Sequence, residues 1–340
     1  MQHPDRPSRA MRRHLRRLWT LALLLAAAGA SAKSPPDPLT LADALSFADE
    51  HPRVQLAAED DLLPRRQPLF LACHSLAFEN ARPGDPERDA AWALTVPAAA
   101  AQRLEIMQRF YDVLLADLSY MRDNEAMAVA YIQFDRAENR QELGQYSPLA
   151  VAELEAAYQH VRRRWAASDA ARRVTRSLLA QALGTPGALP KNLVEPTAPA
   201  PDTPPPELDA VVEAALAENQ RINALRSGTD PAQDSLVAMA VRQQAMELLE
   251  RLALLSVAAE QARVEADWRD LKLDQSRTMY EMEVTADLGY SMSRQTKARR
   301  DRIAVDLCRS LTLAQLDALQ GKPIADAATE PSPGTREQTP

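Results

Sequence analysis

Apolar residues recur every three or four positions along most of the chain, which predicts long helices. In the first such region, 98–143, the recurring positions are Leu104, Met107, Tyr111, Leu114, Leu118 and Met121. This is the spacing of a coiled-coil seam, along which one helix packs against another. Glu125 interrupts the seam, and Ala128 and Ile132 resume it. A helix over 98–143 would be roughly 65–70 Å long, so we expect it to lie against partners of similar length.

The same spacing predicts further helices in the rest of the chain. One is expected over 149–183, with a weaker seam rich in alanine and arginine, and another over 208–225. A long run then begins near Leu236 and is expected to reach Tyr280, and a last run is expected to end near Gln320. The seam of the long run consists of Leu248, Leu252, Leu255, Ala259, Ala262 and Ala266. Thr40 is expected to cap a shorter helix over 39–63.

Three segments lack this periodicity and separate or follow the helical regions. Residues 64–97 contain five prolines and no sustained period, so an irregular insertion is predicted there. Residues 184–206 are rich in proline and predict an extended crossing. Residues 323–340 have the composition of a disordered tail.

A single glycine separates the first two long helices, in the stretch "NRQELGQYSPLAV" at 139–151. The chain has only nine glycines in 340 residues. Gly144 permits a backbone conformation that ends one helix, and Ser147 followed by Pro148 can begin the next. The stretch therefore predicts a tight turn at the tip of a helical hairpin.

The N-terminal region has the three parts of a signal peptide. A basic stretch after Met11 precedes an apolar run from Leu18 to Ala28, which is followed by Ala30-Ser31-Ala32. We expect cleavage after Ala32 and export from the cytoplasm, with both Met1 and Met11 left open as the start. The apolar run is too short to remain as a membrane-spanning helix.

Two pairs of matching segments predict an internal duplication. "FADEHPRV" at 47–54 matches "ALAENQRI" at 215–222 with an offset of 168, and "ELGQYSPL" at 142–149 matches "EMEVTADL" at 281–288 with an offset of 139. The matches occur in the same order in each half. We therefore predict a signal peptide at 1–32, a first repeat at 33–183 that includes the insertion, the crossing at 184–206, a second repeat at 207–322 and a tail at 323–340.

In this order, the motifs resemble those of the TolC-type outer-membrane efflux proteins, which are trimeric exit ducts of Gram-negative export systems. The resemblance covers nearly all of 39–322. It rests on "LADALSFADEHPRVQLA", on "LGQYSPLAV", and on "LLAQALG" before the proline-rich crossing. It implies a homotrimer whose helical hairpins form a hollow barrel across the periplasm. It also implies that the hairpin tips meet a periplasmic adaptor protein, which connects them to an inner-membrane pump.

The resemblance also assigns residues to the two tips. The first tip comprises Gly144, Gln145, Tyr146, Ser147, Pro148, Leu149 and Val151. The second comprises Glu283, Val284 and Thr285, with glutamate at position 283 where the family has glycine. Asp287 is a candidate for the family's acidic gate, although it falls two positions early and Gly289 holds the gate position.

The sequence departs from the family in its membrane-spanning part. The family has four strands per chain, two in each repeat, and a spanning strand needs about 9–11 residues with alternating apolar and polar side chains. The break in the second repeat, near 226–235, is too short for two such strands. In the first break, "PLFLACHSLAF" alternates poorly. We therefore expect the strands to be degenerate or absent.

Composition and chemistry exclude several classes of function. The net charge of −7 argues against a nucleic-acid partner. We find no phosphate-binding loop and no nucleophile motif, so we predict that the chain is not an enzyme and has no cofactor. His51, His74 and His160 lack the spacing of metal ligands. Cys73 and Cys308 could form one disulfide in an oxidising compartment or remain two buried thiols, and both alternatives stay open.

The predicted fold is therefore all-α, with long antiparallel coiled-coil hairpins in a duplicated, TolC-like arrangement. The predicted function is a component of an efflux or type I-like export system in the envelope of a Gram-negative bacterium. Location in the outer membrane or in the periplasm is left open. The alternative function is a soluble periplasmic coiled-coil scaffold or accessory protein that has kept the helices and lost the pore.

Overall fold

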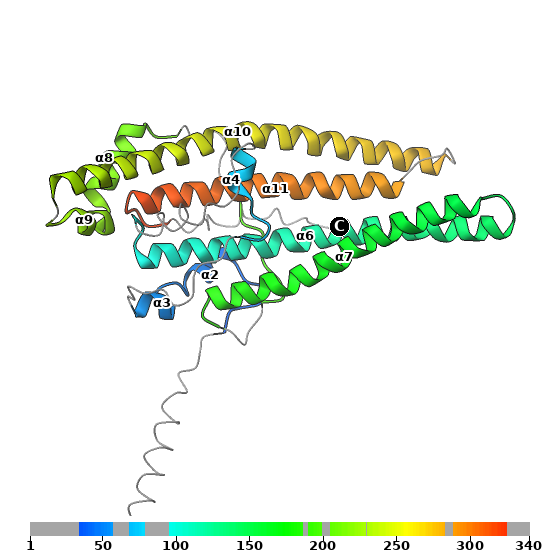
Figure 1. Ribbon diagram of the computed structural model, residues 1–340, viewed down its shortest axis with the longest axis horizontal. Helices are drawn as coiled ribbons and strands as arrows, with labels where there is room; N and C mark the ends of the chain where they lie inside the picture. Colours follow the sequence, from blue (N-terminus) through cyan, green and yellow to red (C-terminus); the bar gives the residue numbers. More distant parts are fainter. Residues whose placement is uncertain are drawn as a thin grey trace, which may run out of the picture.

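The computed structural model describes residues 34–56, 68–78, 95–185, 190–198, 205–228, 230–282 and 288–324. Within them the main elements are four long helices (Figure 1): α6 (Ala98–Glu142), α7 (Pro148–Ala182), α10 (Pro231–Glu281) and α11 (Leu288–Leu319). The short helices are α2 (Leu41–Leu45), α3 (Pro52–Gln55), α4 (Cys73–Ala77), α8 (Leu208–Glu218) and α9 (Gln220–Arg226). The predicted signal peptide, most of the insertion and most of the tail lie outside the described residues.

The predicted all-α fold class is confirmed for the described part of the chain. Its β-structure is limited to an isolated bridge between Leu39 and Leu193. No helix in that part has both the length and the apolar composition needed to cross a lipid bilayer.

The four long helices lie side by side in the order α7, α6, α11, α10, and each runs antiparallel to its neighbour (Figure 1). Hydrogen bonds across the layer fix the level of each helix. Arg164 of α7 donates to Asp123 of α6 at 2.9 Å, and Thr296 of α11 donates to Glu125 of α6 at 2.7 Å. Gln295 of α11 donates to Asp270 of α10 at 2.8 Å. The two outer helices of the layer are therefore α7 and α10.

Two predicted helices are interrupted in the structure. The helix expected over 39–63 consists instead of α2, a turn and α3, and its description ends at residue 56. Pro52 lacks an N–H group and disfavours the helical conformation of His51, which is extended at ψ 137°. The helix expected over 208–225 divides at Asn219, which is extended at ψ 108° and caps α9 with its side chain.

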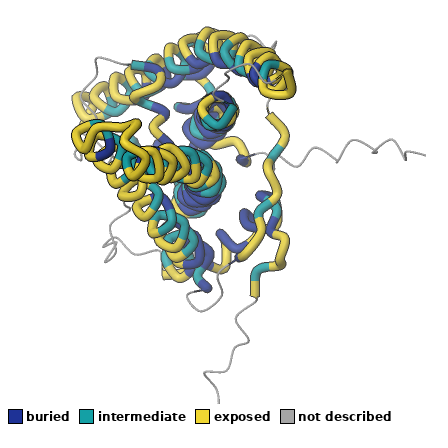
Figure 2. Tube along the Cα trace, turned by 90° about the vertical axis from the view of Figure 1, so that its right-hand side faces the viewer, coloured by how far each residue is buried: buried dark blue, intermediate teal, exposed yellow. Residues whose placement is uncertain are grey.

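The main core lies at the end of the layer away from the hairpin tips. Leu104, Met107 and Tyr111 of the predicted α6 seam are buried there against α11 and the short helices. Closer to the tips the seam is no longer covered: Met121 is 50% exposed and Ile132 is 46% exposed. Viewed end-on, buried residues gather between the helices and exposed residues line the outer sides (Figure 2). Among the described residues, much of the apolar surface on the outer helices is thus left without a neighbour.

Candidate functional site

The turn at the first hairpin tip is defined by Gly144, as the sequence predicts. Gly144 has φ +71°, a left-handed conformation that an L side chain rarely adopts. Its N–H donates to the carbonyl of Gln141 at 2.9 Å, and the N–H of Gln145 donates to the carbonyl of Arg140 at 2.9 Å. These two bonds form a Schellman motif, which satisfies the last carbonyls of α6. Helix α6 therefore ends at one specified residue.

Ser147 and Pro148 begin the second helix of the hairpin. The Ser147 hydroxyl accepts a hydrogen bond from the N–H of Ala150 at 3.2 Å, as expected of an N-cap. Pro148 occupies the first helical turn, where its missing N–H costs nothing. The distance along the chain from the end of α6 to the start of α7 is therefore as short as the two capping motifs allow.

The side chains at this tip divide into an exposed set and one buried anchor. Leu143 is 71% exposed and Leu149 is 79% exposed, although both are large and apolar. Tyr146 is 37% exposed, and the guanidinium of Arg140 lies over its ring at 5.9 Å from the centroid. Val151, by contrast, is buried. Among the candidate residues, Val151 thus stabilises the hairpin, and Leu149 and Tyr146 face outward.

The second predicted tip lies outside the described residues. This applies to Glu283, Val284, Thr285 and the candidate gate residue Asp287. The residues that flank them are described: α10 ends at Glu281 and α11 begins at Leu288, at the same end of the layer as the first tip (Figure 1). The assignment of these four residues remains a prediction.

Glu125, which interrupts the α6 seam, makes one of the polar contacts between the two hairpins. Its carboxylate accepts a hydrogen bond from the Thr296 hydroxyl at 2.7 Å. Burial raises the pKa of the Glu125 carboxyl, and the bond from Thr296 partly offsets this rise. The interruption of the seam therefore corresponds to a specific contact with α11.

Sequence reasoning missed a second apolar seam on α10, on the side opposite its buried seam. Its large members are strongly exposed: Val257 is 70%, Val264 52% and Leu271 70% exposed. The exposed seam consists of Leu236, Met239, Met246, Ala253, Val257, Val264, Trp268 and Leu271. The sequence contained the signal, because these residues also step by three, four or seven positions.

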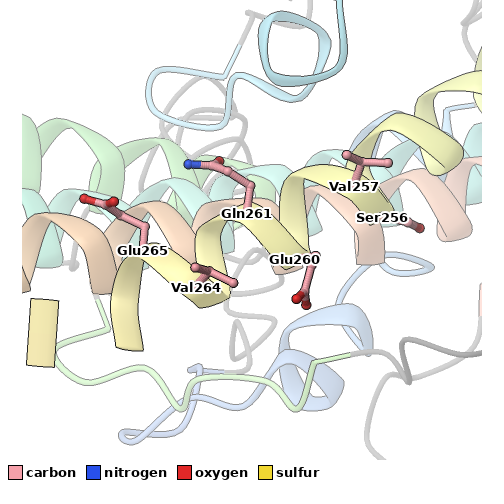
Figure 3. A pocket seen from close by; sticks show the side chains of 6 residues that line it. All are labelled: Ser256, Val257, Glu260, Gln261, Val264 and Glu265. Atoms are coloured by element: carbon pink, nitrogen blue, oxygen red, sulfur yellow. The ribbon is translucent and has the colours of Figure 1, made fainter. Parts of the chain in front are cut away.

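A shallow hollow marks the middle of this exposed face. It has a volume of about 720 Å³, and those of its lining residues that the structure describes all belong to α10 (Figure 3). Those residues are Ser256, Val257, Glu260, Gln261, Val264 and Glu265. A surface of this shape, open along one helix and alternately apolar and acidic, fits a second helix better than it fits a small molecule.

The outer face of α7 has the same spacing but small side chains. Opposite its buried residue Leu179 run Ala152, Ala156, Arg163, Ala167, Ala170 and Val174, all of them exposed. The two edges of the layer are thus different and complementary, because α10 presents bulky residues and α7 presents alanines.

The two cysteines, distant in sequence, are joined in the structure. Cys73 of α4 and Cys308 of α11 form a disulfide. Both lie in the main core, where Cys308 is fully buried. In the described part of the chain, no group of three or more histidine, cysteine, aspartate or glutamate side chains could hold a metal ion.

The fold of this chain has a counterpart among solved structures, although its sequence matches no known family. No protein-family model and no curated protein sequence matches the chain. Among solved structures, CusC matches with a TM-score of 0.50 and 12% identity, over 83% of this chain and 96% of the CusC chain. The chain has the fold of CusC. The CusC structures are described in terms of folding and transmembrane channel formation, and the predicted likeness to TolC-type proteins is confirmed at the level of the fold.

Two further outer-membrane proteins match over the same share of this chain, with lower similarity in shape than CusC. The outer-membrane protein VceC of Vibrio cholerae matches with a TM-score of 0.44 and 13% identity, over 83% of this chain and 96% of VceC. The open state of the MtrE outer-membrane channel of Neisseria gonorrhoeae matches with a TM-score of 0.40 and 15% identity, over 83% and 89% of the two chains.

Proposed function

We propose that this chain is a non-enzymatic, TolC-like component of an efflux or type I-like export system in a Gram-negative envelope. Copies of the chain associate edge to edge into a helical duct, with three copies as the family resemblance implies. The hairpin tips bind a periplasmic adaptor protein that connects the duct to an inner-membrane pump. The observation that supports this proposal most strongly is the exposed seam on α10.

The edges of the layer favour association of α10 in one copy with α7 in the next. A helix with apolar seams on two opposite sides needs two neighbours. Within the residues that the structure describes, α10 has one long-helix neighbour, α11, on its buried side. In the order α7, α6, α11, α10, helices alternate in direction, so an α7 from another copy would continue the alternation. Because the two edges differ, such contacts are head-to-tail, and head-to-tail contacts close into a ring when the rotation from one copy to the next adds up to a full turn.

The apolar seam carries this proposal, and charge does not, because the charged groups at this level have partners within the chain. Arg164 of α7 and Asp270 of α10 are bonded inward, to Asp123 and to Gln295. Asp267 and Asp274 of α10 pair with Arg263 and Arg277 of the same helix.

The first tip supplies the surface for the adaptor. Leu149 and Leu143 are more exposed than most large apolar residues of the chain, at the point farthest from the core. The two capping motifs hold them in a fixed conformation, so little entropy is lost when a partner binds. We expect the adaptor to present a helical hairpin with apolar residues at its own tip.

The association is tested by photo-crosslinking in cells. Val264→p-benzoylphenylalanine in α10 is expected to give oligomers whose crosslinked peptide maps to residues 152–174 of α7. The same substitution at Ala240, which is exposed on the flank of α10, is the control and is expected to give none. If Val264 crosslinks only within its own chain or to other proteins, the edge-to-edge duct is wrong.

The location and the export role need a separate test in a deletion strain. Cell fractions and secreted compounds are compared for the wild type, the deletion and Leu149→Glu, with Ala217→Glu at the far end of the molecule as the matched control. We expect an export defect in the deletion and in Leu149→Glu only. A protein that is released from washed membranes, with no export defect on deletion, would instead identify the periplasmic scaffold.

A further inference from the structure

The joint between the two halves of the chain is the part of the layer that depends on distant sequence. Each hairpin forms between helices that follow one another, whereas α6 of the first half must meet α11 of the second. Along this joint, Tyr111 shares a hydrogen bond with Ser310 at 3.0 Å, and Arg300 donates to Ser119 at 3.2 Å. Each of these polar contacts contributes modestly to stability, and they accompany the apolar packing of the main core between α6 and α11.

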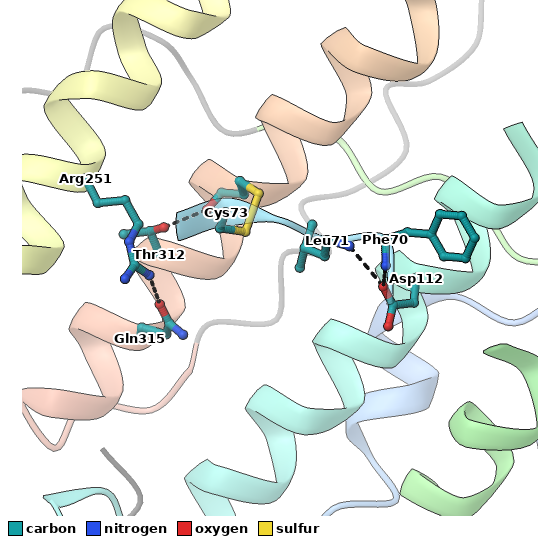
Figure 4. The surroundings of a disulfide bond; sticks show 8 residues. Phe70, Leu71, Cys73, Asp112, Arg251, Thr312 and Gln315 are labelled. Atoms are coloured by element: carbon teal, nitrogen blue, oxygen red, sulfur yellow. Dashed lines mark hydrogen bonds between the residues drawn. A yellow bond between two sulfur atoms is a disulfide. The ribbon is translucent and has the colours of Figure 1, made fainter. Parts of the chain in front are cut away.

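A short segment, 68–78, which we name the strap, crosses this joint (Figure 4). At α6, the buried carboxylate of Asp112 accepts three backbone N–H groups of the strap, from Leu69 at 2.9 Å, Phe70 at 2.7 Å and Leu71 at 3.0 Å. The strap then reaches the second half, where α4 packs against both α10 and α11. It is thus hydrogen-bonded to one half and packed on the other.

The disulfide makes the second attachment covalent. Cys73 lies in the strap and Cys308 lies in α11, 235 residues later in the chain. They are the only cysteines of the sequence, so oxidation within one chain has a single product. In the folded chain, the docking of α11 on α6 and the course of the strap hold the two sulfur atoms together. A bond that closes so long a loop strongly restricts the unfolded chain.

We propose that the Cys73–Cys308 disulfide is an oxidation-dependent lock on the joint between the two halves of the chain. The two thiols together lose two protons and two electrons, and the Sγ atoms of Cys73 and Cys308 become bonded. The electrons and protons pass to the disulfide of an oxidant, which leaves as a dithiol. In the cell, the oxidant would be the disulfide of another protein in the compartment to which the chain is exported. This inference concerns maturation and does not depend on the proposed duct function.

Refolding of the full chain tests the lock without requiring a reductant to reach a buried bond. The protein is unfolded in denaturant with reductant and diluted either with reductant or with oxidised glutathione, and hydrogen exchange is then measured by mass spectrometry. In the reduced arm, we expect at least tenfold faster exchange at the Leu69, Phe70 and Leu71 amides and in the facing stretches of α6 and α11. The α6–α7 hairpin near residues 139–151 is expected to exchange at the same rate in both arms.

Two variants separate the bond from the rest of the strap. Cys73→Ala/Cys308→Ala should behave like the reduced arm in both buffers. Asp112→Asn retains the disulfide and weakens the attachment to α6, so it should speed exchange in the strap while leaving the α6–α11 joint dependent on oxidation. Equal exchange in the reduced and oxidised wild type would overturn the proposal. Loss of protection throughout both hairpins would overturn the assignment of the lock to the joint.

Discussion

His51 and Asn219 hold equivalent positions in the two halves of the chain: each caps a short helix and also binds the end of a long one. His51 accepts the N–H of Arg53 at Nδ1, and its Nε2 lies 3.1 Å from the carbonyl oxygen of Gln181 at the end of α7. Asn219 accepts the N–H of Arg221 and donates to the carbonyl of Leu319 at 2.9 Å, at the end of α11. The two residues are related by the predicted repeat offset of 168, and the duplication stays a prediction that this correspondence supports.

Asn219→Ala is expected to destabilise the protein more than His51→Ala. Asn219 also donates to the carbonyl groups of Thr95 and Ala318, so it connects α9, α11 and the start of α6. Loss of the Asn219 side chain would leave several buried groups unpaired and should lower the free energy of unfolding by about 2–3 kcal/mol. For His51→Ala we expect a loss of about 1 kcal/mol. Urea unfolding measures both, with the exposed Asn124→Ala as the control. Equal losses for Asn219 and His51 would contradict the assigned role.

Two glycines with the same backbone conformation should respond differently to alanine. Gly144 and Gly321 have φ of +71° and +74°. An added Cβ meets nothing within 4 Å at Gly144, but lies 2.8 Å from the Cα of Asn219 at Gly321. We expect Gly144→Ala to lower the free energy of unfolding by about 1 kcal/mol, from backbone strain alone. Gly321→Ala should lower it clearly more, because the new Cβ would also push α9 out of place. Thermal unfolding of the two variants gives the comparison, and similar melting temperatures would refute the close packing.

The pH dependence of stability should reflect Glu125. Burial raises the pKa of its carboxyl above the ordinary 4.5, so the folded chain holds this proton at pH values where the unfolded chain has lost it. Stability should therefore fall as pH rises through the window from about 4.5 to the folded-state pKa. Glu125→Gln removes this dependence, and we expect greater stability at pH 7 with a flatter profile. Urea unfolding across pH tests this, with the exposed Glu138→Gln as the control; a steeper profile for Glu125→Gln would refute it.

The long helices and the first tip were predictable because their signals are local. A repeat of three and four residues specifies a helix whatever its neighbours, and Gly144 with Ser147 specifies a turn through bonds within a few residues. The division at Asn219 was not predictable, because that side chain is held by the carbonyls of Ala318 and Leu319, which are about a hundred residues away. The pairing of Cys73 with Cys308 likewise depends on the docking of α11 against α6.

The exposed seam of α10 was predictable and was missed, for a physical reason. Leu248, Leu252 and Leu255 already account for one neighbour of this helix, and a single seam was sought. The remaining apolar positions, among them Val257 and Val264, repeat with the same spacing half a turn away. A helix with two such faces indicates two long-helix neighbours, and in the described part of the chain α11 is the one that α10 has.

A charge on this second face should abolish association without unfolding the chain. Val264 is 52% exposed in the single chain. In the monomer, the carboxylate introduced by Val264→Glu therefore stays in contact with water, and the free energy of unfolding measured in urea should change little. In an assembly, the same carboxylate would lie between α10 and the apolar face of α7, at a cost of about 2 kcal/mol per contact. That corresponds to association weaker by on the order of 30-fold, which sedimentation velocity over a concentration series can measure. Ala240→Glu adds the same charge to the same helix away from the seam, and it should associate like the wild type. If both variants associate equally, the seam is not the contact between copies, and the layer must close by another surface.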